Sequence, residues 1–286
     1  MNAVHPSEKQ LFAACVVVSA LTYLLLVVVT FGIGLVIGLM ILGGAFLLLG
    51  WQLGQLRGNG VLVSEHQFPE THRVAREMAE RMELAKPPAI YVVESGGALN
   101  AFATRFALRD YVVIYSDVLE LAYEQGEQEV AFVIAHELAH LKRRHPTKFL
   151  LLVGARSVPG LFPAYSRACE HTCDRMAAQQ APTGAVSGLL VLAAGTELYR
   201  HIEANAFARQ TQEDQGFFVW LTEFFSSHPR LPRRVEALQL FVGQLGQLRQ
   251  GAGRVAMPAM AGETPAPRSV LESGGQPVSA RAHESH

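Results

Sequence analysis

Residues 11–51 carry no charged side chain, and this constrains the fold more than any other feature of the chain. A transmembrane helix needs about 20 apolar residues, so the run is about twice as long as one span requires. Glycines near its middle, such as Gly32, favour a turn. The run therefore predicts a transmembrane hairpin over residues 10–53, with helices at about 10–30 and 33–53. A signal peptide, whose apolar core spans only about 7–15 residues, is too short to explain it.

The flanks of the hairpin indicate its orientation. A hairpin returns the chain to the side from which it started, and Lys9 and Arg57 stand on either side of it. Cations next to a span favour the cytoplasmic side, so both ends of the hairpin are expected there. The three cysteines are too few and too scattered for a disulfide framework, and reduced thiols fit better.

Composition divides the rest of the chain. The net charge is −1 at pH 7 and the pI is about 6.8, which predicts no nucleic-acid partner. Residues 1–9 form a short N-terminal segment, and residues 60–249 have enough apolar side chains for one folded domain. Residues 250–286 are rich in glycine, alanine, proline and serine, and this composition predicts a disordered tail.

The motif that carries chemistry is His136-Glu137-Leu138-Ala139-His140. Positions i and i+4 lie on one face of a helix, so both imidazoles can reach one metal ion. Glu137 lies about 100° round the helix, where it can take a proton from a metal-activated water. Acidic residues precede the motif and residues 142–144 are basic, as the dipole of a helix favours. The alternative is a core helix with two hydrogen-bonded histidines.

Periodicity predicts the surrounding elements. Strands are expected at 61–63, 89–93 and 111–115, with an extended segment at 100–104. Helices are expected at 67–84, 116–123, 126–145, 166–180, 185–201 and 233–249. The aromatic cluster at 216–225 favours packing in the core over contact with the membrane interface.

A catalytic zinc site needs three protein ligands and one open position. His145 lies nine residues after His136, about 180° round a continuous helix, so it is expected to face away from the metal and to act as a helix-end cation. Glu170 and Asp174 are spaced i,i+4 and share a helix face. One of these carboxylates can bind the metal while the other holds a histidine ring nitrogen. A solvated acidic face is the alternative.

Four stretches together resemble a known family: residues 99–104, the motif at 136–140, residues 166–174, and His228-Pro229 followed by Arg234. The chain is similar over about residues 60–245 to the membrane-associated zinc metallopeptidases that include the HtpX heat-shock protease and the CAAX prenyl endopeptidase. The resemblance implies a mainly α fold with a small β-sheet (α+β), in which the transmembrane hairpin precedes a zincin-like metalloprotease domain.

The resemblance also implies roles for individual residues. The expected zinc ligands, for one Zn²⁺ per chain, are His136, His140 and Glu170, and the expected general base is Glu137. The implied role of Asp174 is to support the ligands. Asn100 matches a position at the cleft edge where an extended peptide adds as a strand. His228 matches a catalytic histidine that reaches the reaction centre, and a His-Pro turn before the last helix is the alternative.

This chain departs from the family at two places. Related proteases carry a second membrane hairpin between the histidine motif and the glutamate ligand, but residues 146–165 are too short for one. Many relatives have alanine at the position of Cys173. A thiolate near the metal is conceivable, since Cys173 lies about 60° from Glu170 on a helix, but a packed and unreactive thiol is the simpler interpretation.

The sequence thus predicts a membrane-anchored zinc metalloendopeptidase that hydrolyses peptide bonds through a zinc-activated water. Expected partners are protein or peptide substrates and the lipid bilayer, and the expected location is the bacterial inner membrane, as a multi-pass protein with its protease domain facing the cytoplasm. Quality control of membrane or misfolded proteins is the expected role. One alternative is a non-catalytic membrane scaffold that keeps the fold, though a scaffold needs no Glu137. An intramembrane protease is disfavoured because charged residues bracket the motif helix.

Overall fold

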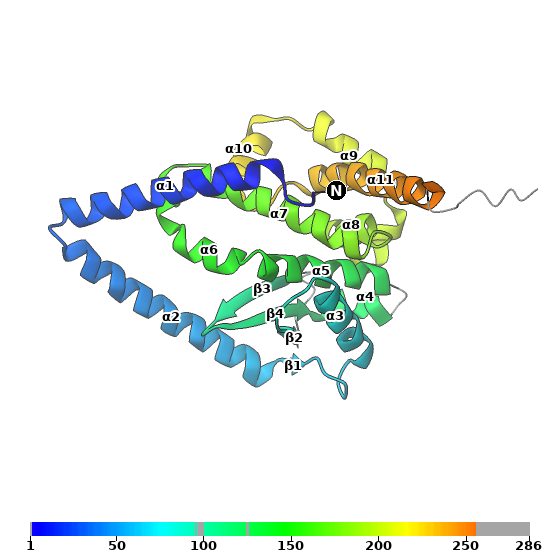
Figure 1. Ribbon diagram of the computed structural model, residues 1–286, viewed down its shortest axis with the longest axis horizontal. Helices are drawn as coiled ribbons and strands as arrows, with labels where there is room; N and C mark the ends of the chain where they lie inside the picture. Colours follow the sequence, from blue (N-terminus) through cyan, green and yellow to red (C-terminus); the bar gives the residue numbers. More distant parts are fainter. Residues whose placement is uncertain (1, 95, 97–99, 124–125, 256–286) are drawn as a thin grey trace, which may run out of the picture. The chain divides into compact units, whose positions relative to one another are not determined.

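The computed structural model describes residues 2–94, 96, 100–123 and 126–255. Most of this part is helical, and its strands form one small mixed sheet (Figure 1). The α-helices are α1 Pro6–Val29, α2 Ile33–Asn59, α3 Pro69–Arg81, α4 Ser116–Tyr123, α5 Glu127–Lys142, α6 His145–Leu151, α7 Leu161–Gln180, α8 Ala185–Leu198, α9 Ala204–Glu213, α10 Phe217–Phe225 and α11 Leu231–Val255. The strands are β1 Val61–Leu62, β2 Ala89–Val93, β3 Ala101–Phe106 and β4 Arg109–Tyr115, and two 3-10 helices are η1 Val153–Ser157 and η2 Tyr199–His201. The predicted α+β class is confirmed.

The chain divides into two compact units, Met1–Leu248 and Arg249–His286. The sites described below belong to the first unit. The predicted disordered tail lies outside the described residues from position 256 onward.

The N-terminal hairpin is present, with helices longer than predicted. The chain turns at Thr30–Gly32, where the backbone φ of Gly32 is 85°, a conformation that glycine adopts without strain. Helices α1 and α2 are both long and apolar enough to cross a membrane, with mean hydropathies of 2.7 and 2.5 over their most apolar windows. Only 11% and 6% of those windows are buried inside the protein, so their leucine, valine and isoleucine side chains face outward.

Helix α1 is fastened to the body of the protein along one side. The Tyr23 hydroxyl donates to the carbonyl oxygen of Leu151 at 3.0 Å and accepts from the backbone N–H of Gly154 at 3.0 Å. A Cβ at Gly154 would lie 2.9 Å from the Cα of Ser19, so glycine permits this close approach. The first membrane helix is therefore part of the packed structure and not a loose anchor.

The sheet has the strand order β1-β2-β4-β3. Strands β2 and β4 are parallel, and β3 runs antiparallel to β4 with Phe106 opposite Arg109. The turn between β3 and β4 contains Ala107 and Leu108, whose φ angles of 47° and 65° are those of a tight two-residue hairpin. Strand β3 forms one edge of the sheet, so its outer backbone groups are available for pairing with an added strand.

Helix α5 lies at the centre of the core. Every residue from Val130 to Ala139 is buried, because α3, α4, α7, α8 and the sheet pack around this helix (Figure 1). Helix α8 approaches its first turn so closely that a Cβ at Gly184 would lie 2.0 Å from the Gln128 carbonyl oxygen. The apolar run before the histidine motif is explained by this all-round burial.

One prediction about packing is wrong. The aromatic cluster expected in the core forms α10, and none of its residues is buried. Phe217, Phe218, Trp220 and Phe225 are all more than half exposed. Phe224 packs closely, with its ring against the backbone at Gly160. The short helices α6 and α9 were not anticipated from the sequence either.

Candidate metal centre

Helices α5 and α7 bring the three predicted metal ligands together. The Nε2 atoms of His136 and His140 lie 3.2 Å apart. Glu170 on α7 places one carboxylate oxygen 3.5 Å from His136 Nε2 and the other 3.3 Å from His140 Nε2. Ligands about 2.0–2.1 Å from a tetrahedral zinc ion stand about 3.4 Å from one another. The three donor atoms therefore fit one zinc ion, with a fourth position left for water or substrate.

Asp174 lies one helical turn after Glu170 and faces the same helix, α5. Its Oδ1 atom is 3.0 Å from His136 Nδ1, the ring nitrogen that points away from the other ligands. Both carboxylates are at least 95% buried. The sequence left open which of these carboxylates would bind the metal and which would hold a histidine ring. In the structure Glu170 lies near the Nε2 atoms of both histidines, whereas Asp174 contacts only the Nδ1 atom of His136.

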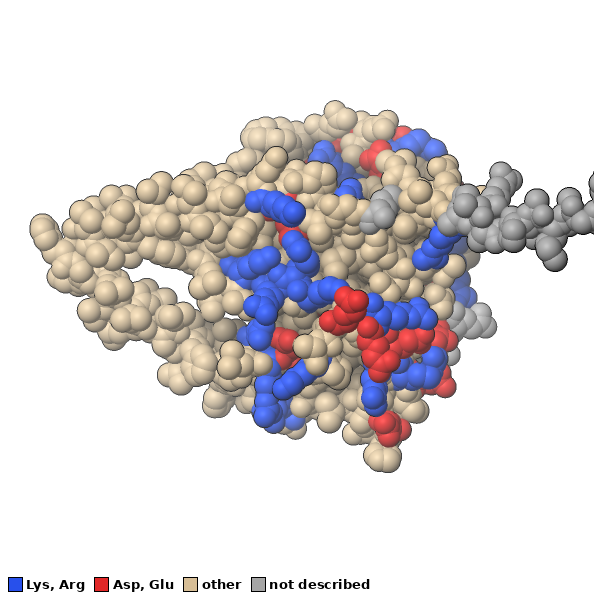
Figure 2. All heavy atoms as spheres, in the orientation of Figure 1, with Lys and Arg blue, Asp and Glu red and all other residues tan. Residues whose placement is uncertain are grey.

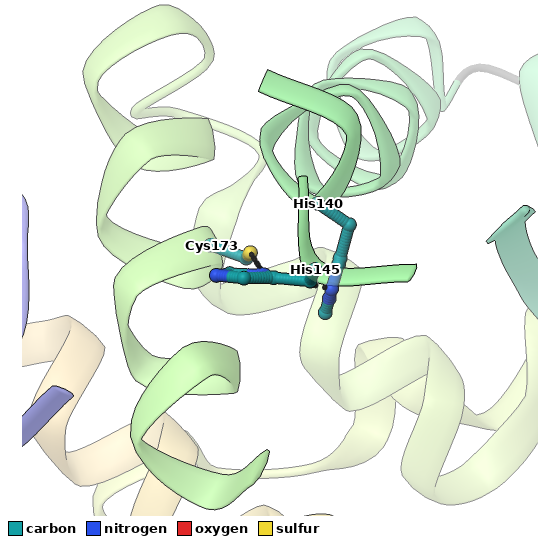
Figure 3. Close-up of side chains that lie close together, drawn as sticks. All are labelled: His140, His145 and Cys173. Carbon is teal, nitrogen blue, oxygen red and sulfur yellow. Dashed lines mark hydrogen bonds between the residues drawn. The ribbon is translucent and has the colours of Figure 1, made fainter. Parts of the chain in front are cut away.

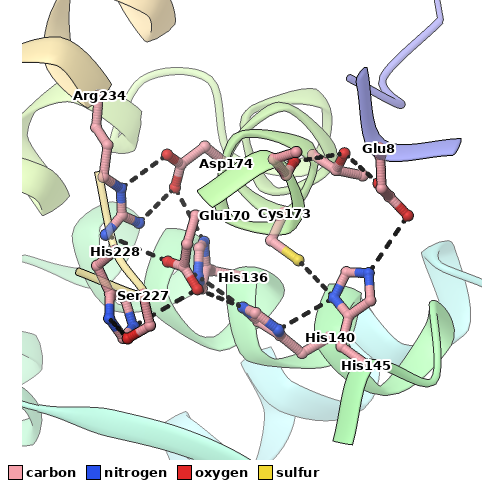
Figure 4. A network of polar contacts seen from close by, with 12 residues as sticks. Glu8, His136, His140, His145, Glu170, Cys173, Asp174, Ser227, His228 and Arg234 are labelled. Carbon is pink, nitrogen blue, oxygen red and sulfur yellow. Dashed lines mark hydrogen bonds and ion pairs between the residues drawn. The ribbon is translucent and has the colours of Figure 1, made fainter. Parts of the chain in front are cut away.

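Arg234 completes this group from α11 (Figure 4). Its guanidinium donates two hydrogen bonds to Asp174, at 2.9 and 2.7 Å, and its Nη1 lies 3.4 Å from Glu170. Arg234 is only 6% exposed. The sequence placed it in the family pattern but suggested no role, because its partners are 60 and 64 residues away in the chain. Arg234 holds the carboxylate that orients His136.

The electrostatics of this group favour a cation between the ligands. Burial would lower the pKa of His136, but Asp174 and Glu170 outweigh it and raise that pKa to about 10. Burial would likewise raise the pKa of Glu170, yet its contacts with His136 and His140 hold the pKa well below its usual range. The pKa of Asp174 is also lowered, because Arg234 and His136 outweigh its burial. Both carboxylates therefore stay ionised.

The prediction that His145 faces away from the metal is wrong. Helix α5 ends at Lys142, Arg144 takes a left-handed φ of 56°, and a new helix, α6, begins at His145. This break turns the fully buried His145 ring back toward the motif, with its Nδ1 3.1 Å from His140 Nδ1 (Figures 3 and 4). The 100° rule assumed one continuous helix, and it failed where the helix broke. Burial lowers the pKa of His145 to about 4, so this ring is neutral.

Glu8, from the first membrane helix, reaches the same network. Its carboxylate accepts a hydrogen bond from the Thr172 hydroxyl, lies 3.5 Å from His145 Nε2 and pairs with Arg143 at 2.6 Å. Glu8 is 2% exposed. The sequence reasoning missed it, since a lone carboxylate at the start of an apolar helix carries no spacing signal. A chain of contacts thus runs from α1 through His145 to His140.

Two cysteines border this network. Cys173 Sγ lies 3.6 Å from His145 Nδ1 and forms a compact group with His140 and His145 (Figure 3). Cys169 lies with Glu8 and His145 in another group compact enough for a metal. Burial raises the pKa of both thiols well above its usual range. Both cysteines are fully buried, as packed side chains are. The simpler interpretation of Cys173 is therefore supported.

A cleft of about 380 Å³ opens over the ligands. Glu137, 7% exposed, lines it together with the ligands. Asn100, just before β3, lines another wall. His228 borders the cleft with a side chain that is 64% exposed, and its Nε2 lies 3.6 Å from Glu170. Six of the residues that the sequence singled out thus line one cleft, namely Asn100, His136, Glu137, His140, Glu170 and His228, whereas Asp174 lies behind the His136 ring.

The chain has recognisable relatives among known proteins. The chain is similar to three proteins described as "Protease HtpX homolog". The one from Thermodesulfovibrio yellowstonii is 35% identical over 83 residues, covering 29% of this chain and 28% of that protein. The one from Salinibacter ruber is 26% identical over 220 residues, covering 64% and 78%. The one from Halobacterium salinarum is 28% identical over 103 residues, covering 36% and 34%. The crystal structure of S. mikatae Ste24p aligns with a TM-score of 0.37 and 14% identity, covering 58% of this chain and 49% of that one.

The family assignment rests on a longer match. Two of the three relatives are matched over about a third of their length or less, so the matches themselves are local. Residues 65–241, more than half of the chain, match peptidase family M48, and this stretch contains β2 to β4, the histidine motif, Glu170 and Arg234. The resemblance inferred from the motifs is confirmed: the chain belongs to peptidase family M48.

Proposed function

We propose that this protein is a membrane-anchored zinc endopeptidase that hydrolyses peptide bonds of membrane or misfolded proteins. The observation that carries the proposal is the spacing of His136, His140 and Glu170, whose donor atoms stand 3.2–3.5 Å apart, as around one tetrahedral ion. Family membership supports the same chemistry. One Zn²⁺ per chain is expected, held by these three residues.

The zinc ion, when bound, would supply Lewis acidity to the attacking water and to the scissile carbonyl. The role of Glu137 is to accept the proton of that water and to pass it to the leaving amine. Its position in the wall of the cleft, on the same helix as the two histidines, suits both transfers. Asp174 holds the His136 ring by its Nδ1, and Arg234 holds Asp174, so the ligand is oriented before substrate arrives.

The substrate would bind as an added strand on β3. Ala101, Phe102 and Ala103 of this edge strand line the cleft together with Asn100, so an extended peptide paired with β3 would pass over the ligands. The imidazole of His228 would donate a hydrogen bond to the developing oxyanion from the open side of the cleft. Backbone pairing recognises extended chains with little dependence on side chains, which suits unfolded substrates.

The membrane hairpin would hold this cleft close to a bilayer. Helix α1 packs on α7 and η1, so the metal centre is held at a defined height relative to the membrane. Lys9 and Arg57 flank the hairpin, which supports a multi-pass protein whose protease domain faces the cytoplasm of a bacterial cell. Membrane proteins with unfolded cytoplasmic segments would be the natural substrates.

The substitution Glu137→Gln tests the proposal. It keeps the size of the side chain and all three ligands but removes the proton acceptor. We expect zinc content near one per chain and a loss of casein cleavage of at least 100-fold. Glu129→Gln, on the same helix but outside the cleft, is the matched control and should cleave normally. Full cleavage by Glu137→Gln would refute the assignment.

A further inference from the structure

A second, basic cleft lies where the membrane helix α2 ends. It has a volume of about 670 Å³ and is bounded by the end of α2, the segment between α3 and β2, the β3–β4 hairpin and the end of α5. Its lining includes six cations, namely Arg57, Lys86, Arg105, Arg109, Lys142 and Arg144. The carboxylates in the lining are Glu83 and Asp110, so six positive and two negative charges leave a net +4.

Most of these cations have no carboxylate partner. Arg105 lies 3.5 Å from Asp110, and Lys142 lies 3.5 Å from Glu83. For the other four cations, the described residues offer no carboxylate oxygen within 4.0 Å of the side-chain nitrogens. Figure 2 shows the Lys and Arg side chains as a blue band across the body, beside the uncharged hairpin. Like charges gathered around one cleft focus a positive potential there, and an anion would relieve their repulsion.

The height of the cleft matches the headgroup layer of a bilayer. Arg57 follows Trp51, the last residue of the uncharged run, by six residues, which is about 9 Å along a helix. The polar layer on each side of a bilayer is about 5–8 Å thick. With the uncharged run in the hydrocarbon, the Arg57 backbone would stand at the outer edge of this layer, from which its long side chain can reach back to the lipid phosphates.

The β3–β4 hairpin is held against the membrane segment of α2. The Phe106 ring stacks on Phe46 with ring centroids 4.7 Å apart, and a Cβ at Gly50 would lie 3.1 Å from the same ring. At the tip, Leu108 is 87% exposed and borders the basic cleft. An exposed leucine next to Arg109, on a tight turn, suits the boundary between the acyl-chain layer and the headgroup layer of a bilayer.

We propose that the basic cleft binds the phosphate headgroup of an anionic membrane lipid, with Leu108 entering the acyl-chain layer beside it. An arginine guanidinium can donate two parallel hydrogen bonds to the oxygens of one phosphate, and three of the four cations without a carboxylate partner among the described residues are arginines. Strand β3 leads from this tip to the wall of the catalytic cleft. A lipid bound at the tip would therefore steady the edge on which the substrate strand is proposed to pair.

Lipid binding can be measured without any proteolysis. The full-length protein in detergent would be titrated with dioleoylphosphatidylglycerol or dioleoylphosphatidylcholine, and bound lipid would be counted by native mass spectrometry. We expect the anionic lipid to bind at least tenfold more tightly. Removing three cations together (Arg57→Gln, Arg109→Gln and Arg144→Gln) should weaken that binding about 100-fold, at about fivefold per cation. Inorganic phosphate at 10 mM should not displace the lipid, because it lacks the acyl chains; displacement would overturn the assignment to a lipid.

A matched control removes the same charge elsewhere. Arg73, Arg76 and Arg209 each lie within 4.0 Å of a carboxylate and do not line the cleft, so their triple change to glutamine should leave binding within twofold. Equal Kd values for the two lipids, or equal losses in the two triple variants, would overturn the proposal. A second readout needs no charge change: with Trp51 and Trp220 replaced by phenylalanine, Leu108→Trp in nanodiscs should be quenched by brominated acyl chains. An unquenched tryptophan would overturn the proposed insertion.

Discussion

Replacing Arg234 by leucine should destabilise the protein far more than the same change at its neighbour Arg233. The Arg234 guanidinium makes two hydrogen bonds to Asp174, at 2.9 and 2.7 Å, inside the protein. Arg234→Leu would leave that carboxylate, itself 2% exposed, without its cation. Removing one partner of a buried pair costs about 3–5 kcal/mol. For a domain of this size each kcal/mol shifts Tm by about 2–4 °C, so Tm should fall by about 6–20 °C.

Arg233 is the matched control. It pairs with Glu223 at 2.8 Å, but half of its side chain is exposed. Exposed pairs contribute about 0.2–1 kcal/mol, so Arg233→Leu should lower Tm by less than about 4 °C. Both variants would be measured by scanning fluorimetry in detergent at one scan rate, with zinc and after treatment with EDTA.

The cause of the loss can be separated from a simple packing defect. In the Arg234→Leu background, Asp174→Asn removes the uncompensated charge and should recover part of the lost Tm, with a coupling of at least about 1 kcal/mol. The loss of Tm in Arg234→Leu should be larger after EDTA treatment. Glu170 lies 3.4 Å from Arg234, so in the zinc-free variant this carboxylate lacks both Arg234 and the metal. Equal Tm losses at positions 233 and 234, or strictly additive effects of the two changes, would refute the reasoning.

Two further predictions concern the residues behind the metal ligands. His145→Phe keeps a ring but removes the nitrogen 3.1 Å from His140 Nδ1, so zinc affinity should fall about 10–100-fold in a chelator competition. Glu8→Gln should cause a smaller loss of zinc affinity. Unchanged zinc Kd values in both variants would contradict this prediction. In EDTA-treated protein, stability should fall as pH rises from about 7 to 10. The folded-state pKa of His136 is raised to about 10 by Asp174 and Glu170, so the contribution of its protonated form is complete below about 6.5 and is lost through 10. A Tm that stays flat or rises over this range would show the sign to be wrong.

The local elements of this fold could be predicted because local rules govern them. The uncharged run predicts the transmembrane hairpin, because an apolar segment of that length can cross a bilayer twice. The strand at Ala89–Val93 and the motif helix follow from periodicity. The pairs His136/His140 and Glu170/Asp174 share faces because each lies within one continuous helix. Spacing and residue type thus predicted the two histidines and a pair of carboxylates, and the family resemblance singled out Glu170 as the third ligand.

Predictions failed where they crossed a break in a helix or depended on the partner of a surface. His145 was placed by extending α5 past its end, and one left-handed residue, Arg144, reversed the direction of its ring. The aromatic helix α10 was assigned to the core because hydrophobicity does not reveal whether a side chain meets protein or something else. Both errors come from the same limit: sequence spacing describes a residue's neighbours only along one unbroken element.

By itself the sequence determined the side chains available to this protein: a helical motif of two histidines and a glutamate, and two carboxylates one helical turn apart, behind an apolar segment long enough to cross a membrane. Only the tertiary structure decided which side chains support the predicted ligands on the side away from the metal position. Glu8 contacts His145, which lies 137 positions later in the chain, and Arg234 contacts Asp174, which lies 60 positions earlier. Neither contact produces a periodic pattern in the sequence. The physical reason is that such contacts arise from the packing of whole helices, α1 and α11 against α7, and packing is set by the combined shape of many side chains.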